Sequence, residues 1–352
     1  MTLLAFLRHM MFCAGLALVS AVTVRAMISA RVMDTPNARK AHANPTPKGG
    51  GVGVVVAFML GIALLYGTAT FSRIADPYFR GVILAAGAIA VVSFIDDIRD
   101  WPFAIKLAAQ VLAALAAIGS GLWISVFHLP LLGTVDIGWV GIPLTLVWLL
   151  FATNAMNFMD GLNGLAAGTA LVACLFLAVI AAQQGGWFVY FAALLLASGL
   201  AGFLPFNFPR ARIFMGDVGS QFCGFVLAVL GVAAARFGAV EQSFLLVPML
   251  LSGVLYDVAF TLARRAFAGD RLTQAHRGHL YQLAHRGGIA ASRVALVHWG
   301  FAALGGLVAH ALRGESRSGR PRSGVFDLRT GLRRWRRGLP LIPANPRAAG
   351  PR

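Results

Sequence analysis

The segment RGVILAAGAIAVVSFIDDIRD, residues 80–100, contains an apolar run that ends in three acidic residues. Only 13 residues of the 352 are Asp or Glu, so three within five positions indicate a site rather than solubilising charge. At helical spacing Asp96, Asp97 and Asp100 share one face, and their carboxylate oxygens are predicted to converge on one hard cation. An acidic cluster at the end of a membrane helix predicts a functional site.

The composition places this segment in a membrane protein. Hydrophobic residues make up 58% of the chain and charged residues 12%, which is far from a soluble globular domain. Apolar runs of about spanning length occur at 9–28, 51–71, 80–95, 103–125, 137–153, 164–183, 187–205, 219–237, 243–263 and 292–311. We therefore expect an all-α, polytopic integral membrane helical bundle of about ten transmembrane helices over residues 1–312. The first run could be a cleaved signal peptide, but it lacks a clear cleavage site, which favours a retained helix.

The distribution of basic residues predicts the topology. A net charge of +17 would suggest nucleic acid as the partner of a soluble protein, but here Lys and Arg orient helices, and no nucleic-acid partner is expected. Alternating loops on one side carry 15 Lys and Arg, whereas the opposite loops carry four. The richer set, expected in the cytoplasm, comprises 25–50, 95–106, 154–163, 205–218 and 264–293. The chemically unusual polar segments all fall in this set, so the catalytic loops are predicted to be cytoplasmic.

The first of these segments is Pro-Thr-Pro-Lys-Gly-Gly-Gly-Val-Gly at 45–53. Free backbone N–H groups at the start of the next helix, with Lys48 beside them, would suit a phosphate. A turn that simply enters a membrane helix would explain the glycines equally well.

Two further loops combine Asx residues with glycine. Residues 154–164, Asn-Ala-Met-Asn-Phe-Met-Asp-Gly-Leu-Asn-Gly, offer donors and acceptors suited to a base or sugar. In the loop 207–220, Asp217 is the only acid and precedes a helix. It could be an N-cap, or the metal ligand that Asp96 and Asp97 need from another helix.

The segment 264–293 is basic and contains His276, Arg277 and His279. Such a loop could hold a diphosphate through Arg and His. A merely orienting loop would explain the arginines but not two histidines at this spacing. Asp257, inside the ninth apolar run, is either a buried hydrogen-bonded residue or part of the cavity.

Together these motifs resemble the polyprenyl-phosphate N-acetylaminosugar-1-phosphate transferases, over roughly residues 30–310 and in the same order. The motifs are Pro-Thr-Pro-Lys-Gly-Gly-Gly, Asp-Asp-x-x-Asp, Asn-x-x-Asn-Phe-x-Asp-Gly-x-Asn-Gly, Phe-Met-Gly-Asp-x-Gly-Ser and His-x-x-His. The resemblance implies transfer of an N-acetylaminosugar 1-phosphate from a UDP-sugar to undecaprenyl phosphate, with release of UMP. It also implies Mg²⁺, or Mn²⁺ in its place, a multi-pass location in the bacterial inner membrane, and compatibility with a homodimer.

The resemblance assigns roles by matching positions. Asp217 is the expected Mg²⁺ ligand, Asp96 is a second ligand or the base on the acceptor phosphate, and Asp97 positions that phosphate or the metal. The catalytic set is Asp96, Asp97, Asp217, His276 and His279, and the substrate-binding set is Lys48, Asn157, Asp160, Asn163, Asn207, Phe214 and Arg277. Within the latter, the Asn, Asp and Phe residues resemble a uridine site, with Phe214 stacking on the base.

Two departures from the family pattern bear on the donor. Position 163 is Asn where the family often has Asp, which puts an anionic role there in doubt. The histidine motif is also sparser than in the peptidoglycan enzyme, which favours the O-antigen-initiating branch and a UDP-N-acetylhexosamine, or its deoxy derivative, as donor.

Other readings of the chain remain open. A membrane prenyltransferase would bind a prenyl diphosphate through Mg²⁺ but would need a second Asp-rich motif. A cation-coupled transporter would place acids near mid-membrane. For the transferase, either direct attack or a covalent aspartyl intermediate fits the residues.

The tail 313–352 carries 11 Lys and Arg, is rich in Pro and Gly, and is expected to have no fold. It could be a periplasmic extension, a segment returning to the cytoplasmic surface, or the product of a shifted reading frame, and the last two are favoured.

Overall fold

A computed structural model describes residues 3–34, 46–66, 76–129, 133–237, 243–271, 276–317 and 326–327. The described chain is overwhelmingly helical, which confirms an all-α polytopic membrane protein. The helices are α1 (Leu3–Ala30), α2 (Gly51–Tyr66), α3 (Pro77–Arg99), α4 (Phe103–Gly119), α5 (Gly141–Phe158), α6 (Leu165–Gln184), α7 (Trp187–Asn207), α8 (Gly216–Phe237), α9 (Leu246–Leu250), α10 (Ser252–Phe267), α11 (Leu280–Arg286) and α12 (Ala291–Arg317). Among the described residues, seven helices are long and apolar enough to cross a membrane, while α2 and α4 are shorter apolar helices. The count of ten spans stays a prediction.

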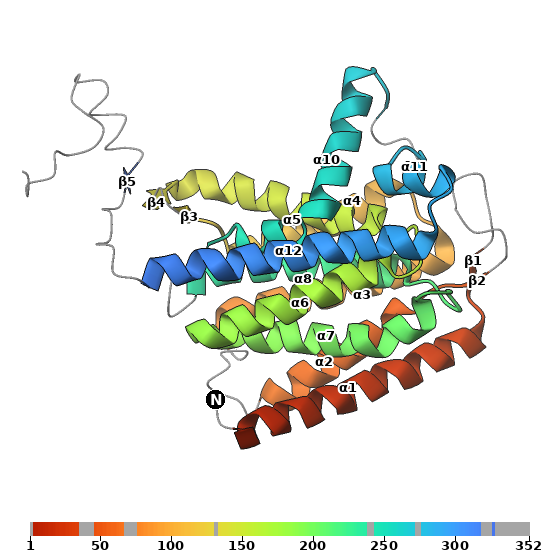
Figure 1. The fold of residues 1–352 in the computed structure, drawn as a ribbon, viewed down its shortest axis with the longest axis horizontal. Helices are drawn as coiled ribbons and strands as arrows, with labels where there is room; N and C mark the ends of the chain where they lie inside the picture. The colour runs from red at the N-terminus through yellow and green to blue at the C-terminus, as the bar shows by residue number, and fades with distance from the viewer. Residues whose placement is uncertain are drawn as a thin grey trace, which may run out of the picture.

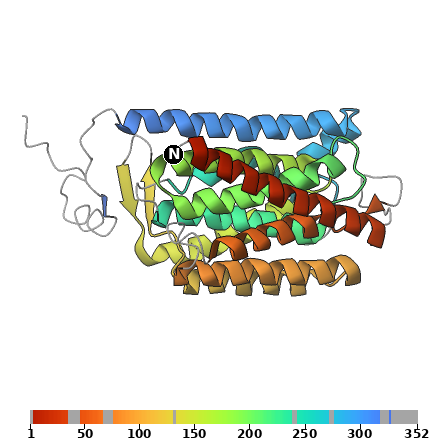
Figure 2. The ribbon, with the colours of Figure 1, turned by 90° about the horizontal axis from the view of Figure 1, so that it is seen from below.

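The long helices run side by side along one axis of the molecule (Figure 1). Helix α8 lies at the centre, packed against α2, α3, α5 and α7, and is buried along almost its whole length. Helix α1 is largely exposed and crosses the bundle obliquely on its surface (Figure 2). In a membrane this pattern leaves the apolar outer faces to lipid and reserves the interior for close helix contacts.

Small residues allow these close contacts. A Cβ atom on Gly51, at the start of α2, would collide with the backbone of Gly219 in α8. A Cβ atom on Gly224 would lie 2.8 Å from the Cα of Thr153 in α5. The central helix is therefore approached closely from two sides, as is common where membrane helices pack through small residues.

The two ends of the bundle differ in chemistry. At the hairpin end, β3 (Val126–Leu129) pairs antiparallel with β4 (Gly133–Asp136), and β5 (Phe326–Asp327) lies parallel to β4. At the opposite end, β1 (Met33–Asp34) pairs with β2 (Thr46–Pro47), and the two small sheets lie far apart (Figure 1). The described parts of the predicted catalytic loops meet beside β1 and β2, at what we call the cluster end.

The ninth predicted span, 243–263, is not one helix. Helices α9 and α10 are separated at Leu251, and Pro248 inside α9 has no N–H to donate. Helix α10 leaves the bundle at a steep angle (Figure 1). Its buried face carries Asp257, Thr261 and Arg265. The prediction of one continuous span was wrong because apolar run length does not report a change of direction, or a polar stripe turned inward.

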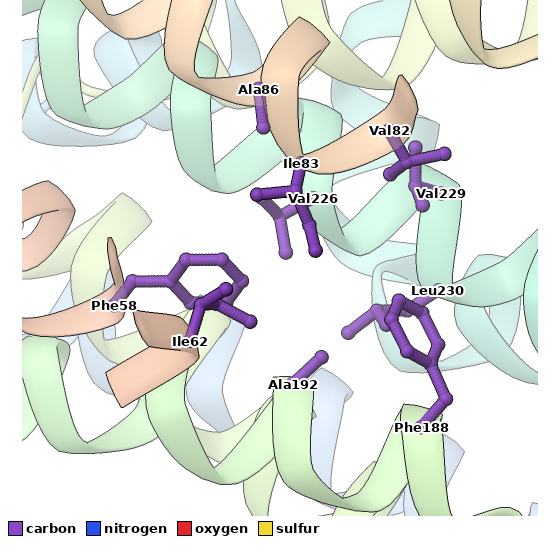
Figure 3. Close-up of a pocket in the computed structure, with 10 residues that line it drawn as sticks. All are labelled: Phe58, Ile62, Val82, Ile83, Ala86, Phe188, Ala192, Val226, Val229 and Leu230. Carbon is purple, nitrogen blue, oxygen red and sulfur yellow. The ribbon is translucent and has the colours of Figure 1, made fainter. Parts of the chain in front are cut away.

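A small cavity lies between α2, α3, α7 and α8 (Figure 3). Its lining is entirely apolar and is formed by Phe58, Ile62, Val82, Ile83, Ala86, Phe188, Ala192, Val226, Val229 and Leu230. Val226 is nine residues beyond Asp217 on α8, which is about 13 Å along a helix. The cavity is therefore separate from the polar groups of the cluster end.

The predicted boundary at residue 312 falls inside a helix. Helix α12 continues to Arg317, and the two tail residues Phe326 and Asp327 pair with β4 at the hairpin end. The remainder of the tail lies outside the described residues, as do 35–45 in the first predicted cytoplasmic loop.

Candidate active site

Three carboxylates and two ammonium groups meet at the cluster end. Asp96 and Asp97 lie in the last turn of α3, and Asp217 lies in the first turn of α8. The Lys106 Nζ is 2.9 Å from Asp96 Oδ2 and 3.2 Å from Asp217 Oδ2. The Lys48 Nζ is 3.8 Å from Asp97 Oδ1. These five residues form the carboxylate–lysine cluster.

Lys106 is the residue that sequence reasoning missed. It was counted only as a topological charge, yet its ammonium group bridges carboxylates from two helices, α3 and α8. A signal was present, because the chain has three lysines among its 30 basic residues. Lys and Arg orient helices equally well, so a lysine in a chain dominated by arginine indicates a need for a compact ammonium group.

Asp97 holds the start of α8. Its Oδ1 accepts a hydrogen bond from the Asp217 backbone N–H at 3.1 Å, and its Oδ2 accepts one from the Val218 N–H at 3.0 Å. Gly216 has a φ of 76°, and a Cβ there would lie 2.6 Å from Asp97 Oδ2. Asp97 thus caps a helix N-terminus from another helix. It thereby fixes the backbone that carries Asp217, and the structure uses both of its oxygens for this.

Asp217 is held by a chain of buried amides. Its Oδ1 accepts from Asn157 Nδ2 at 2.9 Å, and its Oδ2 accepts from Gln221 Nε2 at 3.2 Å. Gln221 Oε1 accepts from Gln110 Nε2 at 2.9 Å, and Gln110 Oε1 accepts from Asn154 Nδ2 at 2.6 Å. Each amide donates towards the carboxylate, and an ionised carboxylate at the end of the chain accepts such bonds at both oxygens.

Gln110 and Gln221 were not predicted as site residues. Their signal in the sequence is an uncharged amide inside an apolar helix, which costs free energy unless it is paired. Gln110 lies four residues after Lys106 on α4, and Gln221 lies four residues after Asp217 on α8. Each helix therefore presents a polar pair on one face.

Asp100 does not share the face of Asp96 and Asp97. Helix α3 ends at Arg99, and Asp100 has a left-handed φ of 50° with its N–H donated to Asp96 O. Asp96 Oδ1 accepts from the Trp101 N–H at 2.8 Å, which fixes this turn. The predicted convergence of all three carboxylates is wrong because the helix terminates before Asp100.

The arrangement suits one divalent cation shared with a substrate. Asp96 Oδ2 and Asp217 Oδ2 both approach the same ammonium atom within 3.2 Å, the place where a cation would be held. No group of three or more His, Cys, Asp or Glu among the described residues forms a complete metal site. Mg²⁺ commonly takes one or two carboxylates and completes its shell with water and substrate phosphates. Asp96 and Asp217 therefore remain the residues that could hold it.

The predicted uridine residues separate into three groups. Asn157 Nδ2 donates to Asp217 Oδ1 and to Ser220 Oγ, which places Asn157 beside the carboxylate–lysine cluster. Asn207 is buried, with its Oδ1 accepting from Gly164 N at 2.7 Å and its Nδ2 donating to Ile213 O at 3.0 Å. Both side-chain amides are engaged within the protein, and contacts of Asn157 and Asn207 with a nucleotide stay predictions.

Asp160, Asn163 and Phe214 lie at the same end of the bundle. Asn163 Nδ2 donates to Pro209 O at 3.2 Å, which joins the α5–α6 turn to the segment before α8. Asp160 follows α5, and Phe214 is partly exposed. Contacts of these three residues with a nucleotide stay predictions.

The glycine segment before α2 is not an open phosphate cradle. The Gly50 N–H donates to Phe214 O at 2.9 Å, and the Gly51 N–H donates to Met215 O at 2.8 Å. Phe214 N–H in turn donates to Pro47 O at 2.8 Å. The glycines permit this close backbone pairing of two helix starts, and the Lys48 side chain reaches Asp97 of the carboxylate–lysine cluster.

The histidine segment packs beside the end of α5. His276 and His279 are stacked with ring centroids 4.9 Å apart, and the His279 ring lies 5.8 Å from that of Phe158. Tyr281 Oη donates to Phe158 O at 2.9 Å, which attaches α11 to the residue after Asn157. Burial is the largest cause that lowers the pKa of His276 to about 4, and neighbouring positive groups add to it. His276 is therefore neutral at physiological pH.

Arg277 lies between the two histidines in the chain and is partly buried. The neighbouring Arg264 Nη2 donates to Gly278 O at 2.7 Å and so fixes this segment against α10. The structure thus brings His276, Arg277 and His279 together near the cluster, as the sequence predicts, on a rigid support.

Comparison with known proteins agrees with these motifs. The sequence profile of the family described as glycosyl transferase family 4 matches residues 79–235. A decaprenyl-phosphate N-acetylglucosaminephosphotransferase of Mycobacterium tuberculosis is 33% identical over 287 residues, covering 74% of this chain and 71% of that protein. The chain belongs to glycosyl transferase family 4.

Other relatives of this glycosyl transferase family 4 protein extend the similarity. A probable undecaprenyl-phosphate N-acetylglucosaminyl 1-phosphate transferase of Bacillus subtilis is 29% identical over 75% of this chain and 72% of its own length. A phospho-N-acetylmuramoyl-pentapeptide-transferase of Moorella thermoacetica is 33% identical over 78% of this chain and 87% of its own length. The protein is therefore a membrane enzyme of the polyprenyl-phosphate sugar-1-phosphate transferase type. The region matched by the profile contains Asp96, Asp97, Lys106 and Asp217, whereas the histidine segment follows it.

Proposed function

We propose that this enzyme transfers an N-acetylhexosamine 1-phosphate from its UDP-linked donor to undecaprenyl phosphate, with release of UMP, at the cytoplasmic face of the bacterial inner membrane. The observation that carries the proposal is the convergence of Asp96 and Asp217 on Lys106, beside a basic histidine segment. Two anionic substrates can react only where their charges are neutralised and their phosphates are aligned. The cluster end supplies both functions at a membrane surface, where a lipid phosphate is available.

In the proposed reaction an oxygen of the lipid phosphate attacks the sugar-bearing phosphorus. A new P–O bond forms, the bond to the bridging oxygen breaks, and that oxygen leaves with UMP. A bound Mg²⁺ would polarise the phosphoryl oxygens and neutralise developing charge. Asp96 and Asp217 would hold it, Lys48 and Lys106 would contact phosphate oxygens, and His276, Arg277 and His279 would hold the donor diphosphate.

Direct attack is preferred to an aspartyl intermediate. Asp97 uses both oxygens to cap α8, and both oxygens of Asp217 accept hydrogen bonds from Asn157 and Gln221. A carboxylate nucleophile would have to give up such bonds before it could attack. The lipid phosphate needs no such rearrangement.

The donor and the cellular role rest on two further arguments. The relatives in Bacillus subtilis, Mycobacterium tuberculosis and Mycolicibacterium smegmatis carry N-acetylglucosamine in their names, which supports a UDP-N-acetylhexosamine donor. The sparse histidine motif favours the same donor over a muramoyl-pentapeptide. Formation of such a lipid diphosphate sugar would begin O-antigen or a related cell-envelope polysaccharide. The cytoplasmic orientation follows from the 15 Lys and Arg expected on the side of the cluster end.

A test uses the purified protein in detergent with undecaprenyl phosphate, Mg²⁺ and a panel of radiolabelled donors. The panel contains UDP-N-acetylglucosamine, UDP-N-acetylgalactosamine and the UDP-muramoyl-pentapeptide. We expect lipid-linked sugar and UMP in equal amounts with a hexosamine donor. Transfer from the muramoyl-pentapeptide donor alone would overturn the donor assignment. Product formation from a prenyl diphosphate acceptor but from no UDP-sugar would overturn the reaction.

Variants test the proposed metal residues. Asp217→Asn and Asp96→Asn should each lower turnover by a factor of at least about 100, because charge neutralisation is the main catalytic contribution here. Asp136→Asn, at the hairpin end, is the matched control and should retain full activity. Wild-type turnover in both cluster variants would contradict the metal assignment.

A further inference from the structure

Asp257 is a buried acid that the proposed reaction does not use. It lies on α10, with 2% of its surface exposed. Its Oδ1 is 3.0 Å from His279 Nδ1 and 3.0 Å from the Leu280 N–H, and its Oδ2 accepts from the Tyr281 N–H at 2.9 Å. Thr261 Oγ1 donates to the same Oδ1 at 3.2 Å. The carboxylate is thus fully engaged, and every donor except Thr261 belongs to the histidine segment.

These contacts define which nitrogen of His279 carries a proton. A carboxylate whose other partners are N–H and O–H donors is an acceptor, so Nδ1 of His279 must donate to it. Nε2 is the ring nitrogen that this contact leaves over, on a side chain that is itself buried, with 5% of its surface exposed. Nε2 is therefore the nitrogen available to a substrate.

His276 has the opposite arrangement. Its Nδ1 accepts a hydrogen bond from the Gly278 backbone N–H at 3.1 Å, so Nδ1 cannot carry a proton. The pKa of about 4 agrees with a neutral ring, which must then be protonated at Nε2. The two imidazoles, stacked at 4.9 Å, therefore differ in the nitrogen whose proton their hydrogen bonds fix, which is Nε2 in His276 and Nδ1 in His279.

We propose that Asp257 is a positioning residue, which holds His279 with Nδ1 protonated and Nε2 directed to the donor, while His276 presents an N–H from its own Nε2. The inference rests on the proposed function for the identity of the donor. Second-sphere carboxylates fix tautomer and ring orientation in the same way at many histidine sites. His276 can then donate to a phosphate oxygen, while the orientation of His279 depends on a charge on another helix.

The surroundings of Asp257 make the role specific. Helix α10 also carries Arg264 and Arg265, and the loop after it carries Asp270, which is 3.3 Å from the Nε of Arg265. Neither Arg264 nor Asp270 is bonded to His279 in the described part of the chain; Arg264 instead donates to Gly278 O. In the part of the chain that the structure describes, Asp257 is the carboxylate that contacts both the ring of His279 and the first N–H groups of α11.

The test compares Asp257→Asn with Asp270→Asn. Both variants lose one carboxylate from the same region, but only the first touches His279. An Asn at 257 cannot accept from His279, Leu280 and Tyr281 at once, because one of its two terminal groups is a donor. We expect Asp257→Asn to raise the donor KM by about 10–100-fold, with the KM for the lipid phosphate unchanged. Asp270→Asn should change neither.

Two measurements keep the result independent of folding and of turnover. In resting protein labelled with ¹⁵N-histidine, we expect His279 to show a protonated Nδ1 and His276 a protonated Nε2, each assigned by its Gln variant. In kinetics, Asp257→Asn combined with His279→Gln should be no worse than His279→Gln alone, because both changes remove the same effect.

Failure of the positioning role and failure of the proposed function give different results. A His279 protonated only at Nε2 in the wild type, an unchanged donor KM in Asp257→Asn, or additive losses in the double variant would each overturn the positioning role. If the wild type transfers sugar from no UDP donor, the proposed function fails. The tautomer spectrum of the resting protein would still decide the role of Asp257.

Discussion

Replacement of Lys106 by Met should convert a site in which two carboxylates share an ammonium group into one that depends on a metal ion for stability. The ammonium group lies 2.9 Å from one carboxylate and 3.2 Å from the other. At an effective dielectric constant of about 20, each contact corresponds to an attraction of about 5 kcal/mol before desolvation is subtracted. Removal of one partner from a buried ion pair typically costs about 3–5 kcal/mol. The Lys106 side chain is 21% exposed and that of Asp217 is 27% exposed, so we expect about 2–3 kcal/mol.

The assay is thermal unfolding of the purified protein in detergent, with EDTA or with Mg²⁺. In EDTA, Lys106→Met should unfold at a lower temperature than the wild type, because Asp96 and Asp217 then repel each other without a shared cation. Mg²⁺ should stabilise the variant more than the wild type, since it occupies the place of the ammonium group. Turnover should nevertheless fall by at least about 100-fold, because the lysine also neutralises charge in the transition state.

Arg99→Met is the matched control for charge. Arg99 is an exposed basic residue at the end of α3, close in sequence to Asp96 and Asp97. The Arg99→Met variant should have the same unfolding temperature in EDTA as the wild type and the same stabilisation by Mg²⁺. Equal unfolding temperatures for Lys106→Met and the wild type in EDTA, or equal stabilisation of the two by Mg²⁺, would refute the reasoning.

Three other perturbations follow from the same geometry. Asp97→Ala should lower stability by about 1–2 kcal/mol through loss of the α8 cap, and it should also reduce turnover. Asp97→Asn keeps one acceptor and should lose less stability. Denaturation and activity assays of both variants check this order. Gln221→Glu should weaken turnover more than Gln221→Met, because a second carboxylate beside Asp217 Oδ2 repels it whereas Met only removes a donor; the ratio of their kcat values is the measurement. In the apolar cavity, Ala192→Val should be neutral or stabilising by about 0.5 kcal/mol. Ala192→Leu should overpack the cavity and cost about 1–3 kcal/mol of unfolding free energy. A Leu variant as stable as the wild type would contradict the small size of the cavity.

The helices were largely predictable because apolar run length is a local property. Each predicted span has a helix in the structure, and the start of α4 at Phe103 agrees with the prediction. The division at Leu251 was not predictable in this way, because the length of an apolar run does not report where the chain changes direction. The polar stripe of Asp257, Thr261 and Arg265 is the feature that would have indicated it.

The site was predictable as a set of residues but not as a set of contacts. The polar motifs identify which loops carry chemistry, and the structure gathers Asp96, Asp97 and Asp217 as expected. Spacing could not separate a capping carboxylate from a ligand, because that depends on which helix N-terminus lies opposite. The sequence left Asp217 as either a helix cap or a metal ligand, and it gave Asp97 a role in positioning the phosphate or the metal. In the structure Asp97 caps α8, and Asp217 faces Lys106.

The charge of the cluster gives an order to the proposed binding events. When all five groups are ionised, three carboxylates and two ammonium groups leave one net negative charge, in a region where an unbalanced buried charge is costly. That remainder favours a divalent cation over an anion as the first ligand. Once the cation is present the net charge is positive by one unit, and the same region then attracts a diphosphate. The number of lysines in the cluster therefore affects both cation binding and substrate binding. With a third lysine in the cluster, the resting site would be neutral and would bind the cation less well. With one lysine, the site would retain too little positive charge after the cation binds to attract two anionic substrates.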